Sequence, residues 1–426
     1  MYTFLVLFVL SAAAALAQAP LIFTQTPRYA AAPEARFPAG ASLEIVDGGR
    51  VRPLVPGFAA SADAAVSYDG LRVLFSAKPK PGDAWQIWEM ALAGGAPRKI
   101  AAYAEDAIAP FYLPGGHIVY ARRARANWQI ETIPLEGGEP ARLTYTPGSH
   151  LPTDVLRDGR ILFEAPFPAF PSATREIYTV YSDGSGVEAY RCDHGPSRHA
   201  ARQVASRDVV FATPKGLARF TSALAAQVNI ESARGGEFAG PVAEISPENW
   251  LVAFRPNPRA AYALYHLAAA GGAPRAISDQ PGVQPALLAA REAPLRFPSG
   301  LHDWAGANVL CLNAYTSQAR ITEGSIASVR LYSQGAGGQP SLLGETAVES
   351  DGSFFLHVPS EQPLRIELRD RSGRGIVGER GWFWMRRGEQ RVCVGCHAGP
   401  ERAPENAVPK VLLRRDVPVR MTGGGV

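Results

Sequence analysis

The residues with the clearest chemistry lie near the C-terminus, in the run Cys393-Val394-Gly395-Cys396-His397. Two cysteines separated by two residues and followed at once by a histidine form the attachment signature of a c-type haem. Each thiol adds across one haem vinyl group, and the adjacent imidazole is then held where it can ligate the iron. We therefore predict one covalent haem c, attached to Cys393 and Cys396, with His397 as an axial ligand of the iron.

Two other kinds of site also use paired cysteines. A zinc ribbon requires a second pair, and the remaining cysteines, Cys192 and Cys311, stand alone in the sequence. A thioredoxin-like dithiol requires a βαβ context, and no such pattern surrounds the motif. Haem attachment is therefore the favoured interpretation. Cys192 and Cys311 either form a disulfide in an oxidising compartment or stay buried thiols.

The sixth position of the iron has several candidates. Met421 lies beyond the motif and could complete His/Met ligation, which raises the reduction potential. Alternatively, Met421 belongs to a frayed tail, because three glycines follow it almost at once. Histidines elsewhere are further candidates, although a lone histidine is more often an ordinary packing or surface residue. They are His150, His194, His199, His302 and His357.

The N-terminal segment, residues 1–19, is apolar and ends in Ala17-Gln18-Ala19. An apolar stretch followed by small residues is typical of a secretory signal peptide, and this stretch is short for a membrane span. We therefore expect export to the periplasm or the extracellular space, with no stable membrane span after cleavage. Covalent haem attachment outside the cytoplasm agrees with this location.

The charge of the chain is concentrated near the motif. The formal net charge is +4, which is too small to indicate nucleic-acid binding. Between Glu379 and Arg420 there are nine Lys/Arg against five Asp/Glu, so the excess of four lies in this segment. These charges either face solvent and the haem propionates or form a docking face for an acidic protein. We expect a redox partner protein and no nucleic acid.

Residues 40–300 repeat with a period of about 40–50 residues, as four-stranded propeller blades do. One marker is a short strand followed by paired glycines, and another is a tight turn followed by an apolar strand. The first marker includes Trp85-Gln86-Ile87 before Gly94-Gly95, Trp128-Gln129-Ile130 before Gly137-Gly138, Glu176-Ile177-Tyr178 before Gly184-Ser185-Gly186, and then Gly235-Gly236 and Gly271-Gly272. The second includes Asp69-Gly70, Gly115-Gly116 and Asp158-Gly159. We predict an all-β chain with a β-propeller of about six blades.

Residues 301–426 do not follow the repeat. Strand patterns cover residues 326–332 and 364–369, and residues 348–359 form a hairpin pattern around Asp351-Gly352. They predict a small β-sandwich-like domain that carries the haem segment. Three aromatic residues, Trp382, Phe383 and Trp384, precede the motif. They either pack on the macrocycle or seal the sandwich against the propeller.

One run of residues extends from Gly344 through Glu349-Ser350-Asp351-Gly352-Ser353-Phe354-Phe355, Val358-Pro359 and Gly388-Glu389 to the haem motif. This run resembles the middle domain of the hydrazine synthase alpha subunit. Members of this family place the domain after a TolB-like propeller. The resemblance implies a propeller fused to a haem-binding β domain. In the family's enzyme a tyrosine shortly after the motif ligates the active haem. Here Glu401 stands at that place, which makes His397 the expected iron ligand.

These patterns leave three functions open. The first is an exported monohaem c-type cytochrome-like protein that transfers electrons, with the propeller as a docking scaffold. The second is a haem enzyme or sensor with an open iron position that acts on small nitrogen or oxygen species. The third is a propeller binding module in which the haem is structural. The sequence does not decide whether the chain is an enzyme, and it identifies no catalytic residue.

Overall fold

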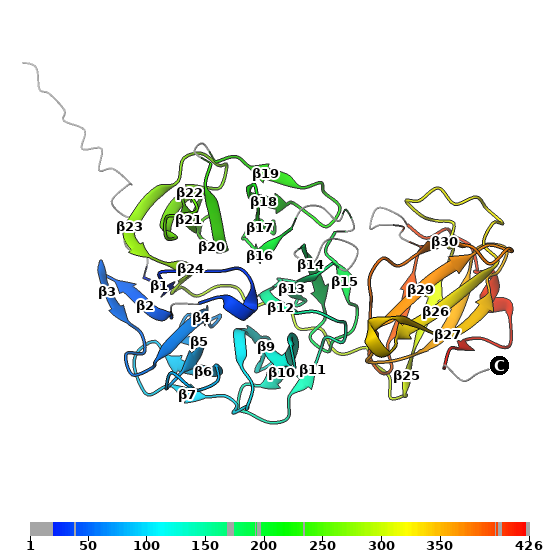
Figure 1. Cartoon of the computed structure of the whole chain (residues 1–426), viewed down its shortest axis with the longest axis horizontal. Helices are drawn as coiled ribbons and strands as arrows, with labels where there is room; N and C mark the ends of the chain where they lie inside the picture. Colours follow the sequence, from blue (N-terminus) through cyan, green and yellow to red (C-terminus); the bar gives the residue numbers. More distant parts are fainter. Residues whose placement is uncertain are drawn as a thin grey trace, which may run out of the picture.

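The computed structural model describes residues 20–37, 40–167, 174–191, 193, 197–232, 235–396, 398 and 403–422. Within these ranges the chain forms eight four-stranded sheets and three short 3₁₀ helices. Figure 1 shows six of the sheets arranged as a ring and the other two packed together beside it. The fold is therefore all-β, as predicted. The predicted signal peptide, residues 1–19, lies outside the described residues.

Each sheet of the ring is one propeller blade, and six blades confirm the predicted number. The first three blades are β24 (Val283–Leu287) with β1 (Leu21–Gln25), β2 (Ser42–Asp47) and β3 (Arg50–Pro53); β4 (Ala60–Val66) to β5 (Arg72–Lys78), β6 (Gln86–Ala91) and β7 (Arg98–Lys99); and β8 (Ala107–Leu113) to β9 (His117–Ala124), β10 (Asn127–Pro134) and β11 (Ala141–Arg142). The others are β12 (Leu151–Val155) to β13 (Ile161–Pro166), β14 (Arg175–Val180) and β15 (Glu188–Ala189); β16 (His199–Gln203) to β17 (Val209–Thr213), β18 (Gly216–Phe220) and β19 (Val228–Ile230); and β20 (Glu237–Ser246) to β21 (Asn249–Arg255), β22 (Ala263–Ala268) and β23 (Arg275–Pro281).

The ring is closed by the pairing of β1 with β24, in which Leu21 lies opposite Leu287. This pairing protects the edges of both strands, as closure does in propellers generally. The strands of the ring therefore extend from Leu21 to Leu287, whereas the sequence pattern placed the repeats at residues 40–300. Strand β1 was missed because a Pro/Ala-rich stretch separates it from β2, and its other partner comes from the far end of the repeats.

The predicted tight turns connect the first and second strands of their blades. Gly70 and Gly159 adopt positive φ angles of 75° and 84°. Side chains at these two turns would meet the linker between propeller and sandwich, residues 288–305. A Cβ on Gly70 would lie 2.7 Å from the Ala290 amide nitrogen, and one on Gly159 would overlap the Leu295 carbonyl oxygen. Glycine thus serves both the turn conformation and the close passage of the linker.

The paired-glycine series is correct for most blades but wrong for Gly235-Gly236. Gly94-Gly95 and Gly271-Gly272 connect third and fourth strands, as the pattern predicts. Gly235-Gly236 instead precedes β20 and so lies between two blades. Gly236 has a φ of 94°, and a Cβ there would lie 2.5 Å from the Phe254 ring. Glycine is therefore required here by close packing against β21, the neighbouring strand of the same blade, which the sequence pattern does not distinguish from a turn.

The repeated glutamine of the first marker ties one blade to the next. The Gln86 amide donates hydrogen bonds to the carbonyl oxygens of Tyr103 and Glu105, both at 3.1 Å. Gln129 donates to Gly148 in the same way, at 3.0 Å. These bonds satisfy backbone groups in the segments that lead into the following blades. They explain why the marker recurs in phase with the fold.

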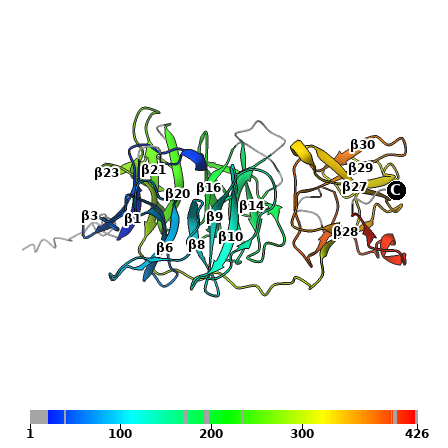
Figure 2. The ribbon, with the colours of Figure 1, turned by 60° about the horizontal axis from the view of Figure 1, so that its bottom comes forward.

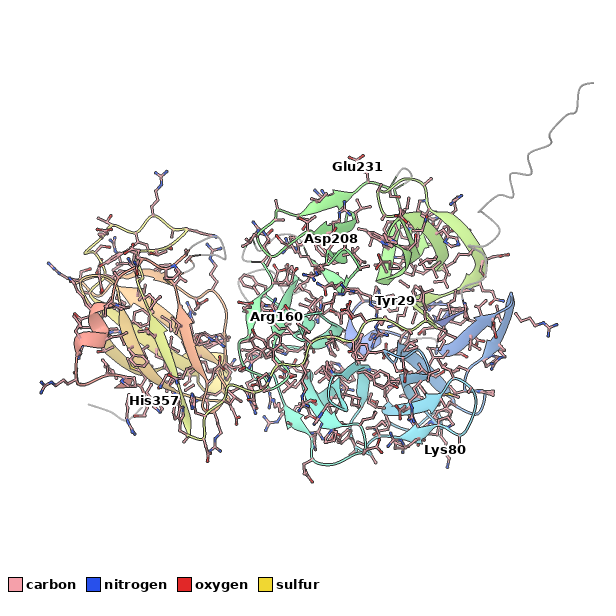
Figure 3. The ribbon with its side chains drawn as sticks, turned by 180° about the vertical axis from the view of Figure 1, so that it is seen from behind. Tyr29, Lys80, Arg160, Asp208, Glu231 and His357 are labelled. Atoms are coloured by element: carbon pink, nitrogen blue, oxygen red, sulfur yellow. The ribbon has the colours of Figure 1, made fainter. Side chains whose placement is uncertain are left out.

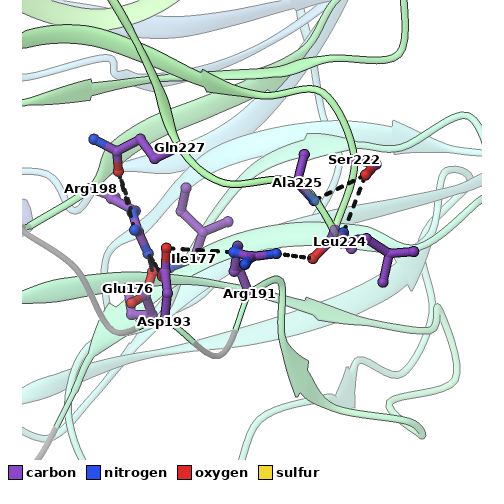
Figure 4. A network of polar contacts seen from close by, with 10 residues as sticks. Glu176, Ile177, Arg191, Asp193, Arg198, Ser222, Leu224, Ala225 and Gln227 are labelled. Atoms are coloured by element: carbon purple, nitrogen blue, oxygen red, sulfur yellow. Dashed lines mark hydrogen bonds and ion pairs between the residues drawn. The ribbon is translucent and has the colours of Figure 1, made fainter. Parts of the chain in front are cut away.

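In the fourth blade a buried ion pair takes the place of the glutamine. Arg198 is 1% exposed and donates to Glu176 at 2.8 Å and to Asp193 at 2.8 Å (Figure 4). Gln227 accepts two further bonds from the same guanidinium. The guanidinium also lies 4.8 Å from the centre of the Phe220 ring. Asp193 thus forms ion pairs at the junction between the two blades. The residues on either side of it in the sequence, Cys192 and His194, lie outside the described residues.

The second body is a β-sandwich. One sheet has the order β31 (Gln390–Cys393), β25 (Gly306–Cys311), β28 (Phe354–Pro359) and β32 (Val419–Arg420), and the other has β27 (Pro340–Ala347), β26 (Ser328–Gln334), β29 (Leu364–Arg369) and β30 (Gly375–Gly378). The 3₁₀ helices are η2 (Pro33–Ala35), η3 (Ala336–Gly338) and η4 (Lys410–Leu413). Apolar side chains from both sheets, such as Val309 and Leu368, fill the space between them. No helix in the described ranges is long and apolar enough to span a membrane.

Candidate haem site

The two motif cysteines lie at the edge of the sandwich. Cys393 ends β31, which runs parallel to β25 and places Cys393 opposite Cys311. The Leu312 amide donates to the Cys393 carbonyl oxygen at 2.9 Å, and Cys396 follows in a turn. All three thiols are free. His397 and Cys192 lie outside the described residues, so the axial-ligand role of His397 and the pairing of Cys192 with Cys311 stay predictions.

The motif turn is pressed against a neighbouring loop. A Cβ on Gly395 would overlap the Thr316 carbonyl oxygen and lie 2.8 Å from the Asn313 carbonyl oxygen. Because these are backbone atoms, neither can move aside without shifting its loop. The glycine between the two cysteines therefore allows the turn to lie against residues 313–316.

We expect Gly395→Ala to destabilise the sandwich by about 1–3 kcal/mol, since overpacking forces backbone shifts of this cost. Gly300→Ala is the matched control, because a Cβ there meets no atom within 4 Å. Urea unfolding of both variants measures the difference. Equal unfolding midpoints would contradict the close docking of the motif turn.

The thiols are held in their neutral form. Burial, with a further contribution from Glu379, raises the pKa of Cys396 to about 12, and burial also raises the pKa of Cys393. Redox-active CxxC pairs instead have a lowered thiol pKa, because the thiolate is the nucleophile. The environment of these cysteines thus differs from that of a redox dithiol. Within the described ranges, no group of three or more His, Cys, Asp or Glu side chains could hold a metal ion.

A cavity of about 580 Å³ lies between the sandwich and the fourth blade, and Cys393 is in its wall. The blade contributes aromatic residues, including Phe163 and Tyr178, and the sandwich contributes Trp382 and Phe383. Figure 1 shows the outer strand of this blade, β15, facing the sandwich. The volume falls within the usual range for cofactor and ligand pockets.

Trp384 joins the two domains beside this cavity. It is 2% exposed and packs among apolar residues of the third and fourth blades, including Leu143 and Phe163. Its indole N–H donates to the Gly184 carbonyl oxygen at 3.3 Å. The sequence allowed the three aromatics either to seal the domains or to pack on a macrocycle. Trp384 does seal them, and all three line the cavity.

Glu389 is a second interface residue, which the sequence analysis missed. It is 5% exposed, and one carboxylate oxygen accepts from the Gly186 amide at 3.2 Å and from Arg391 at 2.7 Å. Its other oxygen accepts from the Arg386 amide at 2.8 Å. Glu389 thereby fixes the strand that carries Cys393 to the propeller. In the sequence, Glu389 stands out only as part of the family pattern at Gly388-Glu389, which gives no sign of its role at the interface.

His150 is the one predicted histidine, among those that the structure describes, that lines the cavity. Its Nε2 lies 2.9 Å from the Thr146 hydroxyl, and its Nδ1 is buried without a hydrogen-bond partner. Burial, with Arg175 nearby, lowers the pKa of His150 to about 3, so the ring is neutral at pH 7. The other candidate histidines that the structure describes lie elsewhere: His199 faces Glu164, His302 stacks on Trp304, and His357 bonds Asn308.

The buried neutral state of His150 predicts a loss of stability in acid. Its pKa in the unfolded chain is 6.5, so below pH 6.5 the unfolded state binds the extra proton and unfolding becomes easier. We expect a loss of about 2 kcal/mol between pH 6.5 and pH 5 from this group. His150→Gln should flatten that slope in urea unfolding, whereas replacement of the exposed His117 by Gln should leave it unchanged. Equal slopes in the two variants would contradict the assignment.

Met421 does not lie beside the motif cysteines in the structure. It is 1% exposed and belongs to the sandwich core, with its sulfur against Gly344. It follows β32, which lies at the opposite edge of the sheet from β31. Three strand spacings separate those edges, about 14 Å. Met421 is therefore a core residue, neither in a frayed tail nor placed beside the haem motif.

The described fold is a six-bladed propeller joined to a β-sandwich, and the cavity between them has Cys393 in its wall. Residues 321–398 match the family described as hydrazine synthase alpha subunit middle domain. Hydrazine synthase of Kuenenia stuttgartiensis has a similar structure, with a TM-score of 0.79 and 17% identity over 93% of this chain and 71% of that chain. TolB from Acinetobacter baumannii gives a TM-score of 0.47 and 15% identity over 63% of this chain and 66% of that chain. No curated protein shows a significant sequence match. The predicted resemblance of this segment is thereby confirmed.

Proposed function

We propose that this chain is an exported c-type haem protein in which Cys393 and Cys396 attach the haem. We further propose that a small nitrogen or oxygen compound reacts in the cavity between the fourth blade and the sandwich. The observation that carries the proposal is that Cys393 lies in the wall of this cavity, which separates two domains and has an aromatic lining. When bound there, a haem would supply an iron centre able to bind small molecules or exchange electrons.

The residues around the cavity suit an apolar macrocycle with charged edges. Trp382, Phe383 and Tyr178 offer aromatic surface and limit the entry of water. Arg380 also lines the cavity, and guanidinium groups form strong paired hydrogen bonds with carboxylates such as haem propionates. His150 adds a neutral nitrogen without a partner, the form in which histidine binds metals.

The family match supports a catalytic or sensing role more than simple electron transfer. The matched segment, residues 321–398, contains both cysteines and is named for an enzyme of nitrogen chemistry. The name of that family also describes a subunit, which supports a protein partner for this chain. We further propose export, because the predicted signal peptide and covalent haem attachment agree with an oxidising compartment outside the cytoplasm.

The test is an absorption spectrum of the full chain, expressed with its N-terminal segment in bacteria that mature c-type cytochromes. We expect a coloured protein whose reduced spectrum changes on addition of CO, because an open iron position binds CO. A coloured protein whose reduced spectrum does not change on addition of CO would exclude an open position on the iron. A colourless protein from a strain that matures a control cytochrome would exclude haem altogether.

Electron transfer is the second candidate, favoured by the surface next to the motif. Val392, between Arg391 and Cys393, is 59% exposed, and Arg380 and Arg387 are exposed without ion pairs among the described residues. An apolar residue near positive charges suits docking of an acidic redox protein. Part of the positive charge is already used, since Arg386 pairs with Glu361 and Arg414 with Glu349. A reversible redox couple without CO binding would favour this function.

A further inference from the structure

The axis of the propeller contains a small cavity, with several charged side chains in a largely apolar lining, that is separate from the candidate haem site. The innermost strands of the blades surround it, and its volume is about 80 Å³. Several of these strands bulge at the axis, with residues in the left-handed region: Asp63, Ala109, Ala200 and Gln284. The bulges turn polar groups toward the axis. In a regular strand the backbone groups among them would instead bond to the neighbouring strand.

Both faces of the propeller are crossed by chain segments. The connection from β1 to β2, with η2, lies at the centre of the ring in Figure 1 and on one face in Figure 2. Tyr29 and Arg36 of this connection line the cavity. The linker of residues 288–305 runs along the opposite face (Figures 2 and 3), where the Leu295 amide donates to the Arg157 carbonyl oxygen at 2.9 Å. The small cavity therefore suits a small ion better than an extended ligand.

Most charges at the axis are neutralised by neighbours. Asp63 forms an ion pair with Arg36 and accepts from Gln284 at 2.8 Å. Glu164 forms an ion pair with Arg175 at 3.2 Å and accepts from the Ala200 amide at 3.0 Å. Each of these two acids thus has a guanidinium of its own. The pairs leave no net charge at the axis.

Arg202 is the exception. It lines the cavity, yet its side chain forms no hydrogen bond or ion pair within the described ranges, and its Nε is buried without a partner. Asp154 is the acid that interacts electrostatically with the Arg202 guanidinium, but no oxygen of Asp154 lies within ion-pair distance of it. The Asp154 carboxylate instead accepts a hydrogen bond from the Gln203 amide at 2.8 Å. Burial also raises the pKa of Asp154. The Arg202 guanidinium therefore has no partner in direct contact, which is costly in a confined space unless an anion joins it.

We propose that the propeller axis binds one small planar oxyanion, such as a carboxylate or nitrate, through the Arg202 guanidinium. The planar fork of a guanidinium matches two oxygens of such an ion with parallel hydrogen bonds. A cavity of about 80 Å³ has room for an ion of a few heavy atoms. This site is independent of the haem, because neither of the two motif cysteines lines the axial cavity.

The experiment is calorimetric titration and thermal unfolding of the full chain with formate, acetate or nitrate, against chloride at equal ionic strength. We expect saturable binding of the planar oxyanions and a higher unfolding temperature, with no such effect from chloride. Arg202→Gln should weaken binding roughly ten- to a hundredfold. The control Arg259→Gln removes an exposed charge and should bind as the wild type does.

Two results would overturn the proposal: equal stabilisation by chloride, or unchanged oxyanion affinity in Arg202→Gln. If Arg202→Gln does not fold, Arg202→Lys decides, because lysine keeps the charge but loses the planar fork. That variant should bind formate, acetate and nitrate more weakly than the wild type. Wild-type affinity in Arg202→Lys would exclude recognition by the guanidinium.

Discussion

The variant Cys393→Ala/Cys396→Ala is expected to contain no covalent haem, and its intact mass should equal that of the polypeptide alone. Each thioether bond requires one cysteine sulfur, so removing both sulfurs leaves no point of attachment. Denaturing electrophoresis with haem staining, followed by intact-mass measurement, checks this result. The loss should be complete, because the only other described thiol, Cys311, is 2% exposed inside the sandwich.

Cys311→Ala is the matched control for this prediction. Cys311 lies opposite Cys393 on the adjacent strand, so its replacement perturbs the same region of the sheet. We expect this variant to retain covalent haem, with a moderate loss of stability from the small cavity that it creates. Covalent haem in the double variant, or its absence from Cys311→Ala alone, would refute the assignment of the attachment residues.

Trp384→Ala is expected to destabilise the chain by about 3–5 kcal/mol, the usual cost of truncating a buried aromatic residue. Trp384 fills the apolar cluster between the third and fourth blades and donates to the Gly184 carbonyl oxygen. The substitution removes both contacts and so loosens the domain interface beside the cavity. Urea unfolding, followed by tryptophan fluorescence and circular dichroism, measures the change.

Trp304→Ala is the control, since Trp304 is 37% exposed and stacks on His302. We expect it to change the free energy of unfolding by less than about 1 kcal/mol. A Trp384 variant as stable as the Trp304 variant would mean that the interface does not depend on this side chain. Separate unfolding transitions in Trp384→Ala would indicate that the two domains have become independent.

Local patterns predicted the repeat architecture because each blade is built from neighbouring residues. Asp69-Gly70 and Gly94-Gly95 were correctly placed at turns, since positive φ angles restrict such positions largely to glycine. Strand β1 and Gly235-Gly236 were misjudged because their roles depend on partners distant in the sequence. The pairing of β1 with β24 closes the ring, and Gly236 meets the Phe254 ring.

The candidate site was predictable only in part. The spacing of Cys393 and Cys396 indicates haem attachment by itself, because the chemistry depends on a short local turn. The sequence could not show that His150 and Tyr178 share a cavity with Cys393, because no local pattern records the docking of two domains. It also left Met421 as a candidate ligand, and strand order alone places that residue at the far edge of the sheet.

The sequence by itself determined the all-β class, the repeating blades and the paired cysteines, because these depend on residue spacing within a few turns of chain. The tertiary structure alone decided how the ring closes, which blade faces the sandwich, and which charges at the propeller axis find partners. Those features depend on contacts between residues as far apart as Leu21 and Leu287, or Gly184 and Trp384. Packing, rather than local preference, selects such contacts.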